Sequence, residues 1–175
     1  MKIRIFKIGG RTIKTVIAVF LCFLVDFLRK SGEPFYGAIA AILCIQQNSK
    51  DSFSVAVNRE IATIIGGIWG MIILFIEKNI YCIPHELLRY LFLSLMLIPI
   101  INFSVFIKQE KGTFLMCVVF LCITVVHGND VNPLTFGLNR ILDTTIGIVI
   151  ALGINGIQMR KLCSIFIKSS RRLLR

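Results

Sequence analysis

Six apolar stretches alternate with short polar connections along the 175 residues of the chain. A helix needs about 20 apolar residues to cross a bilayer, and fewer where its ends reach the interface. The stretches are residues 12–28, 34–45, 58–76, 87–107, 112–126 and 138–157. Backbone groups cannot stay unpaired in lipid, and the sequence lacks the alternating pattern of a barrel, so each stretch should be helical. The pattern predicts an all-α integral membrane protein with six transmembrane helices.

The connections are short and rich in turn-forming residues, which leaves no room for a second domain. We therefore predict one six-span module over residues 1–160 and a basic cytoplasmic tail over residues 161–175, lying on the inner membrane surface. Pro99 interrupts the fourth stretch, where its missing backbone donor should kink or bend the helix. The bend is either a tolerated irregularity or a functional hinge.

Basic residues are unevenly distributed about the apolar stretches. Fifteen of the 20 Lys and Arg residues lie in the N-terminal arm, around residues 50–59, at 108–111 and in the tail from residue 160. Basic segments of membrane proteins stay cytoplasmic, so this alternation predicts six crossings of the cytoplasmic membrane with both termini inside. Five apolar stretches follow the first one, and no cleavage site separates them, so the first is expected to be a span rather than a signal peptide.

Composition excludes several classes of protein. With 56% hydrophobic and 17% charged residues, a soluble domain is implausible. The net charge of +11 is concentrated at the two ends without interleaved aromatic residues, which favours anionic lipid of the inner leaflet over nucleic acid as a partner. The six cysteines show no metal or redox spacing, and the two histidines lie in predicted loops. No catalytic or nucleotide-binding motif is present, so we expect no enzyme activity, metal or cofactor.

The sequence also resembles itself at a shift of 81 residues. The shift places Asn58-Arg59 on Asn139-Arg140, and Thr63 and Gly66 on Thr144 and Gly147. Two units of three spans, about residues 10–78 and 86–158, would lie in opposite orientations, as in many secondary transporters. The shift also aligns the two shortest spans, the second and fifth, which either mark a transport path or are simply short helices. Polar residues, Gln46 among them, follow the second span.

Small residues recur at helical spacing in the third and sixth spans. They are Gly66, Gly67 and Gly70 in the third span and Gly147, Ala151 and Gly153 in the sixth. Such residues let helix backbones approach closely in lipid. We therefore expect these two spans to pack inside the bundle or at a subunit contact.

Several of these residues resemble a known family. The opening Gly9-Gly10-Arg11-Thr12-Ile13-Lys14, the run at 34–41 and Asn58-Arg59 with Thr63 and Gly66 resemble the bacterial aromatic acid exporter and fusaric acid resistance superfamily. Plant aluminium-activated malate channels are similar more distantly. The resemblance covers about residues 5–157. It implies a six-span module that assembles as a homodimer or higher homo-oligomer and moves organic anions, such as aromatic carboxylates or malate, with efflux as the expected direction. Relatives often carry Gln-Pro and Gly where this chain has Gln46-Gln47 and Ala62.

Ionisable residues near the hydrocarbon are candidate functional groups, although each could instead anchor its helix at the interface. They are Lys14, Asp26, Arg59, Glu60, Arg89, Arg140 and Asp143. Arg59 and Arg140 occupy equivalent positions in the first turn of their predicted spans, where a guanidinium could clamp a carboxylate. We hypothesise that Arg59 faces the cytoplasmic mouth and Arg140 the outer mouth of an anion path.

The remaining residues of the hypothesised path are Arg11, Lys14, Gln46, Asn58, Thr63, Asn139, Asp143 and Thr144. Asp143 either carries protons or forms an ion pair, for which Arg140 one turn earlier is a possible partner. The alternative to transport is a non-transporting membrane scaffold or accessory subunit. A polar path holding Arg59 and Arg140 would favour transport, and a dry interface would favour the scaffold.

Overall fold

The computed structural model describes residues 9–30, 33–79, 85–126 and 133–156, which form helices joined by short turns. The elements are α1 (Gly10–Arg29), α2 (Pro34–Cys44), α3 (Ser49–Asn79), α4 (Glu86–Leu95), α5 (Leu97–Phe106), the 3-10 turn η1 (Glu110–Gly112), α6 (Thr113–Leu121), the π-helix η2 (Cys122–Val126) and α7 (Pro133–Gly156). Helices occupy all six predicted stretches, so the all-helical class is confirmed. The predicted tail at 161–175 lies outside the described residues.

The helices differ in their ability to cross a membrane. Within the described residues, three helical segments are long and apolar enough to do so, namely Ser49–Asn79, Glu86–Phe106 (α4 and α5 taken together) and Leu134–Gly156. In contrast, α2 has 11 residues and is about 16 Å long, roughly half the thickness of the hydrocarbon core. Length and composition therefore support a multi-pass membrane protein with three candidate spans.

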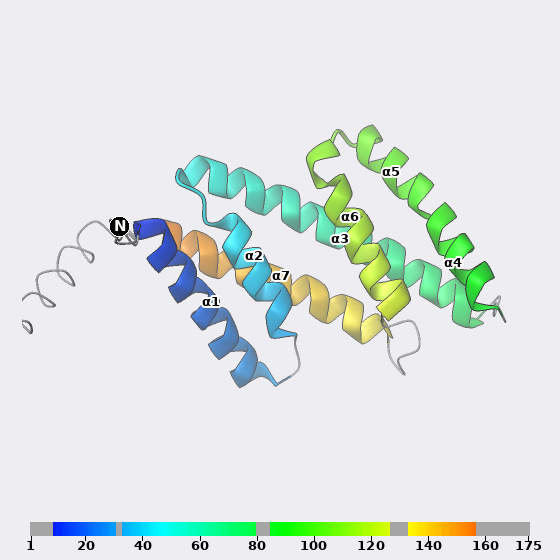
Figure 1. The fold of residues 1–175 in the computed structure, drawn as a ribbon, viewed down its shortest axis with the longest axis horizontal. Coiled ribbons are helices and arrows are strands. Elements are labelled where there is room, and N and C mark those ends of the chain that lie inside the picture. The colour runs from blue at the N-terminus through cyan, green and yellow to red at the C-terminus, as the bar shows by residue number, and fades with distance from the viewer. Residues whose placement is uncertain (1–8, 31–32, 80–84, 127–132, 157–175) are drawn as a thin grey trace, which may run out of the picture.

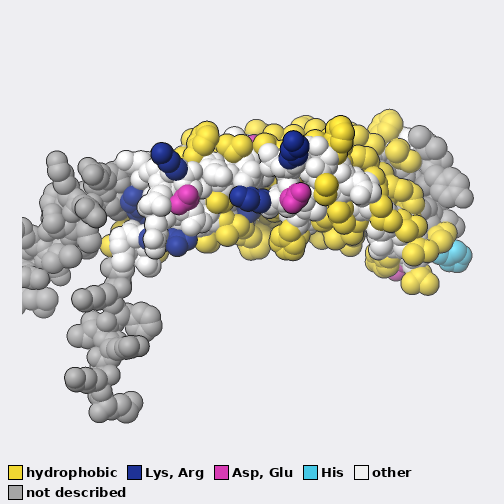
Figure 2. All heavy atoms as spheres, turned by 90° about the horizontal axis from the view of Figure 1, so that it is seen from above, with side chains coloured by type: hydrophobic (Ala, Val, Ile, Leu, Met, Phe, Trp, Pro, Cys, Tyr) yellow, Lys and Arg dark blue, Asp and Glu magenta, His cyan; other side chains and the backbone are white. Residues whose placement is uncertain are grey.

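Two long helices form the centre of the bundle. α3 and α7 lie side by side and run in opposite directions, with α1 and α2 on one side and α4, α5 and α6 on the other (Figure 1). Figure 2 shows Lys and Arg side chains gathered on the half of one face nearer the N-terminal end, whereas hydrophobic side chains cover the opposite end. Large exposed hydrophobic residues occur on every long helix, as expected of a surface in contact with lipid.

Glycines allow the short helices to cross the central pair closely. A Cβ added to Gly147 on α7 would lie 2.2 Å from the carbonyl oxygen of Gly37 on α2. A Cβ added to Gly66 on α3 would lie 2.4 Å from the carbonyl oxygen of Met116 on α6. The backbones therefore touch at both crossings. Gly153, in the same predicted stripe as Gly147, is exposed and has no atom near its Cβ position.

The kink or bend predicted at Pro99 takes the form of an interruption between two helices. α4 ends at Leu95, and α5 begins at Leu97, with Pro99 in its first turn. The proline ring clashes with the carbonyl four residues earlier, here that of Leu95, and Pro99 cannot donate a hydrogen bond to it. This local conflict explains why one apolar stretch forms two helices.

Similar backbone features recur in the two halves of the chain. Lys30 directly follows α1 and has φ 53°. Lys108 is the second residue after α5 and has φ 57°. They are the non-glycine residues with positive φ in the described part of the chain. In each half, this left-handed residue precedes the short helix, α2 or α6, that crosses the long helix of the other half.

Candidate functional site

Arg59 and Arg140 are both buried within the bundle, with 7% and 5% of their surface exposed. Neither lies in the first turn of its helix, so that part of the prediction is wrong. α3 begins at Ser49 and α7 at Pro133, several residues before the apolar stretches. The unpaired backbone donors at the helix starts therefore lie away from both guanidinium groups. Any anion would be held by side chains.

Arg59 faces a cavity of about 270 Å³ between α2, α3 and the start of α6. The lining residues are Leu43, Val55, Asn58, Arg59, Lys111, Gly112, Phe114 and Leu115. The wall thus combines two cations and one amide with apolar and aromatic surface. Arg59 Nε is buried without a hydrogen-bond partner among the described residues. Arg59 and Asn58, which were both predicted to belong to the anion path, therefore line the same cavity.

Arg140 on α7 lies over the aromatic ring of Tyr36 on α2. Its guanidinium carbon is 3.2 Å from the ring centroid of Tyr36 on α2, and its Nε and NH1 have no hydrogen-bond partner among the described residues. The Tyr36 hydroxyl lies 3.0 Å from the sulfur of Cys122, the first residue of the π-helix. Cation–π contact stabilises the charge in part, but it leaves Nε and NH1 of Arg140 without hydrogen bonds among the described residues.

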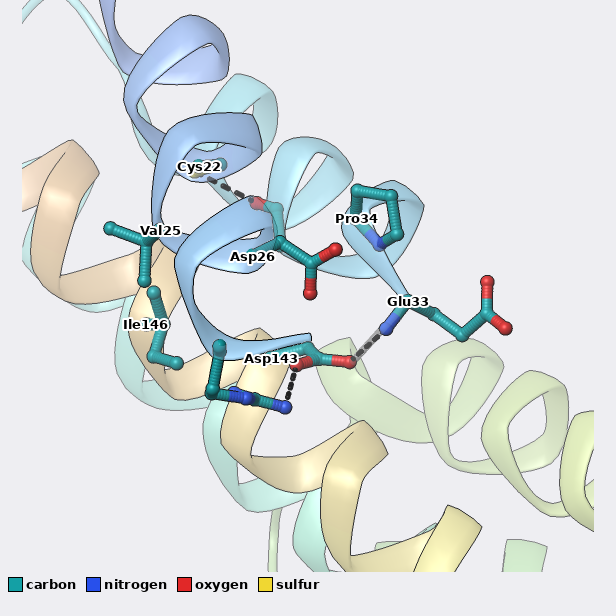
Figure 3. Close-up of a pocket in the computed structure, with 9 residues that line it drawn as sticks. Cys22, Val25, Asp26, Glu33, Pro34, Asp143 and Ile146 are labelled. Carbon is teal, nitrogen blue, oxygen red and sulfur yellow. Dashed lines mark hydrogen bonds and ion pairs between the residues drawn. The ribbon is translucent and has the colours of Figure 1, made fainter. Parts of the chain in front are cut away.

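Asp143 joins three helices and is 5% exposed. Its Oδ1 accepts a hydrogen bond from Arg29 at 2.6 Å, and its Oδ2 accepts one from the backbone N–H of Glu33 at 2.9 Å. Figure 3 shows the carboxylate reaching toward Glu33 at the start of α2. The surrounding pocket has a volume of only about 10 Å³. Arg29, rather than Arg140, is therefore the ion-pair partner of Asp143.

The corresponding position in the first half differs. Ala62 on α3 stands where the repeat places Asp143, and a Cβ added to Gly112 would lie 3.2 Å from the Ala62 Cβ. A small apolar contact thus replaces the ion pair. The Arg59 side of the bundle keeps a large cavity, whereas the Asp143 side is nearly filled.

Side chains from other helices bond the carbonyl groups at the end of α2. Arg11 Nε donates to the Ile45 carbonyl at 3.0 Å, and Asn155 Nδ2 donates to the Gln46 carbonyl at 3.3 Å. Ile45 and Gln46 directly follow α2, where the helix no longer supplies partners for carbonyl groups, and these two bonds replace them. α2 can therefore end inside the protein.

The same polar cluster includes Lys14 and Ser52. Lys14 Nζ donates to the backbone oxygen of Asn155 at 3.0 Å, and Asn155 Nδ2 donates to Ser52 Oγ at 2.6 Å. The structure thus brings predicted residues Arg11, Lys14 and Gln46 together. Their bonds hold helix ends in place rather than leaving them free for an anion.

An equivalent bond occurs in the second half. Arg89 on α4 donates to the Thr124 carbonyl at 2.8 Å and forms an ion pair with Glu77. Arg11 and Ile45 are 34 residues apart, and Arg89 and Thr124 are 35 residues apart. Arg11 near the start of α1 thus bonds the residue that follows α2, and Arg89 near the start of α4 bonds the π-helix that follows α6.

Comparison with known proteins identifies the family. The family model described as aromatic acid exporter family member 1 matches residues 6–158. The chain belongs to the aromatic acid exporter family. The resemblance to these exporters is thereby confirmed, and similarity to plant malate channels stays a prediction. No curated protein and no solved structure matches the chain.

Membership of the aromatic acid exporter family indicates membrane transport of organic acids. Within this family member, the two threonines of the predicted path do not face the cavity. Thr63 Oγ1 donates to the Arg59 carbonyl at 2.9 Å, and Thr144 Oγ1 donates to the Arg140 carbonyl at 3.0 Å. Both are 1% exposed. Their bonds stay within their own helices. Asn139, on the same turn as Arg140, is partly buried.

Sequence reasoning missed several polar residues of this exporter family protein. Tyr36 and Asn155 lie within or beside apolar stretches, and a polar group in such a stretch is the available signal. Glu60 was recognised only as an ionisable residue, because the sequence does not indicate its neighbours. The described residues include no group of three or more His, Cys, Asp or Glu side chains placed to hold a metal ion.

Proposed function

We propose that this protein carries small organic anions, aromatic carboxylates among them, out of the cell, and that the Arg59 cavity binds the anion during transport. The observation that carries the proposal is a buried cation, lacking a partner at Nε, on the wall of a cavity of about 270 Å³. An apolar cavity of about 150 Å³ is enough to hold benzene, so a single-ring acid fits. Family membership supports the same class of cargo.

The lining of the cavity suits both parts of an aromatic carboxylate. The planar guanidinium of Arg59 matches a carboxylate in two parallel hydrogen bonds, and Lys111 adds a second positive charge. Phe114, Leu115 and Leu43 provide apolar surface for a ring. A buried charge without a full set of partners is costly, so an incoming carboxylate is stabilised there. Arg140, with its unused donors over Tyr36, is proposed as a second anion position further along the path.

We further propose that all six helical segments take part in crossing the cytoplasmic membrane, as two inverted three-helix repeats with both termini in the cytoplasm. The alternation of basic segments supports this orientation. The antiparallel α3 and α7, the left-handed Lys30 and Lys108, and the matching bonds of Arg11 and Arg89 support the repeat. The module is expected to assemble as a homodimer or higher homo-oligomer in contact with anionic lipid.

Exchange measurements on the full chain in proteoliposomes test the proposed site. Labelled benzoate, phthalate and malate would be exchanged against unlabelled compound, for wild type and for Arg59→Gln. Loss of a charged hydrogen-bond donor costs about 1.5 kcal/mol, so we expect exchange at low substrate concentration to fall by about tenfold. Arg59→Lys, which keeps the charge but loses the planar fork, should show an intermediate rate.

Lys50→Gln is the matched control, because Lys50 is an exposed cation in the first turn of the same helix. Its exchange rate should equal that of wild type. Equal rates for Arg59→Gln and wild type, at equal protein content in the vesicles, would exclude Arg59 from the path. Wild-type protein that exchanges none of the compounds would instead favour the scaffold function.

A further inference from the structure

Glu60 on α3 is a partly buried carboxylate without an ion-pair partner among the described residues. Its Oε1 lies 2.6 Å from the hydroxyl oxygen of Thr145 on α7. Its Oε2 is buried and has no hydrogen-bond partner in the described part of the chain. A carboxylate in this setting is unusual, because a buried charge is normally paired.

The hydrogen bonds of Thr145 accommodate two protonation states of Glu60. Thr145 Oγ1 lies 2.6 Å from Glu60 Oε1 and 2.9 Å from the carbonyl oxygen of Ile141. A hydroxyl has one proton and can donate to only one of these acceptors. When Glu60 is ionised, Thr145 donates to Glu60. When Glu60 is protonated, Glu60 donates to Thr145, which donates in turn to Ile141. The Thr145 hydroxyl therefore has an acceptor for its proton in both states without any movement of the backbone.

The hydrogen bonds of Asp143, in contrast, accommodate only its ionised state. Arg29 and the backbone N–H of Glu33 both donate to its carboxylate, and neither can accept a proton from it. Protonation of Asp143 would break at least one of these bonds. The idea that Asp143 carries protons therefore fits the structure less well than its role in holding helices together.

The charged surroundings of Glu60 are simple. Arg59 on the same helix and Cys44 on α2 are two titratable groups whose charges interact with that of Glu60. α7 presents Thr145, while its charged residues face other partners: Arg140 lies over Tyr36 and Asp143 pairs with Arg29. α6 contains no Asp, Glu, Lys, Arg or His, and the π-helix contains none either. On η1, Lys111 shares the cavity of Arg59, while Glu110 is not among its lining residues.

We infer that Glu60, in contact with Thr145, is the proton-binding residue of this transporter and that it takes up a proton when an organic anion binds at Arg59. The inference rests on the proposed function of the Arg59 cavity. Without an anion, the positive charge of Arg59 stabilises the negative charge of Glu60. A bound carboxylate neutralises Arg59, and Glu60 Oε1 then takes up a proton from the solvent to become a carboxylic acid that donates to Thr145. Anion and proton leave together, so an accumulated monocarboxylate exits down its gradient without net charge movement, whereas a dicarboxylate carries one net negative charge.

Infrared difference spectroscopy of the full chain in lipid tests the protonation directly. Between alkaline and acidic buffer without any ligand, wild type should gain a carboxylic-acid C=O band that Glu60→Gln lacks. Thr145→Val should shift the frequency of this band, whereas Thr145→Ser, which keeps the hydroxyl, should not. The matched control is Glu86→Gln, at an exposed glutamate in the first turn of α4, and it should keep the band. A band that is identical in wild type and Glu60→Gln would overturn the inference.

Phthalate-driven proton uptake tests the coupling. Phthalate is used because its two charges prevent it from crossing lipid unaided. Entry of phthalate into vesicles holding a pH-sensitive dye should acidify the lumen in wild type and Glu86→Gln, and the acidification should fall about tenfold or more in Glu60→Gln. Equal acidification by wild type and Glu60→Gln, or phthalate exchange by wild type without any acidification, would also overturn the inference. Absence of phthalate exchange together with an intact Glu60 band would contradict the proposed function instead.

Discussion

Replacement of Gly147 by alanine is expected to separate α2 from α7 and to lower the free energy of unfolding by about 3 kcal/mol or more. The added Cβ would lie 2.2 Å from the carbonyl oxygen of Gly37 and 2.9 Å from its carbonyl carbon. These are backbone atoms, so the contact can be relieved only by moving the whole of α2. Thermal unfolding in detergent, followed by the helical circular dichroism signal, measures the effect.

Gly153→Ala on the same helix is the matched control. No atom lies within 4 Å of the Cβ position of Gly153. Alanine is favoured over glycine in a helix by up to about 1 kcal/mol, so this variant should unfold at the same or a slightly higher temperature than wild type. If Gly147→Ala and Gly153→Ala unfolded at the same temperature, the close contact of α2 with α7 would be wrong.

Replacement of Asp143 by alanine is the second change with a large expected effect. It removes the carboxylate that accepts the hydrogen bonds of Arg29 NH2 and of the backbone N–H of Glu33. Removal of one partner from a buried ion pair costs about 3 kcal/mol, and less here because Arg29 is partly exposed. α1 and the start of α2 should then loosen from α7. Cys22, which is 3% exposed and lines the same pocket, should become reactive toward a membrane-permeant maleimide.

Asp51→Ala serves as the comparison for Asp143→Ala. Asp51 is an exposed acid in the first turn of α3, and its described hydrogen bond is a local one from Asn48. This variant should keep Cys22 unreactive and change the unfolding temperature little. Equal protection of Cys22 in wild type and Asp143→Ala would show that the ion pair does not hold α1 in place.

The positions of the helices could be predicted because six apolar stretches and the residues between them carry a strong local signal. The residues at which α3 and α7 begin could not be predicted from the sequence. Residues 49–57 are mostly polar and read as a connection, yet they continue α3 because Ser52 and Ala56 are buried against other parts of the fold. Asn155, about 100 residues away in sequence, bonds Ser52. Such a distant partner leaves no trace in local hydrophobicity.

The candidate site was predicted in part for the same reason. Arg59 and Arg140 could be recognised because a charge beside an apolar stretch is rare and needs a function or a partner. The ion-pair partner of Asp143 could not be recognised from the sequence, because Arg29 is 114 residues away and belongs to another helix. The pairing of Glu60 with Thr145, 85 residues apart, was hidden in the same way. Sequence identifies ionisable groups, whereas folding decides which of them are paired.

The short length of α2 has a consequence for biosynthesis. A helix of 11 residues is too short to partition into a bilayer independently, so in the proposed topology α2 enters together with its neighbours in the growing chain. Asn155 and Asp143, which bond the chain just after α2 and just before it, are both on α7. The ribosome synthesises α7 after every other described helix. Maturation of the first half therefore waits for the last helix, and a chain that stalls before α7 leaves both ends of α2 without these bonds.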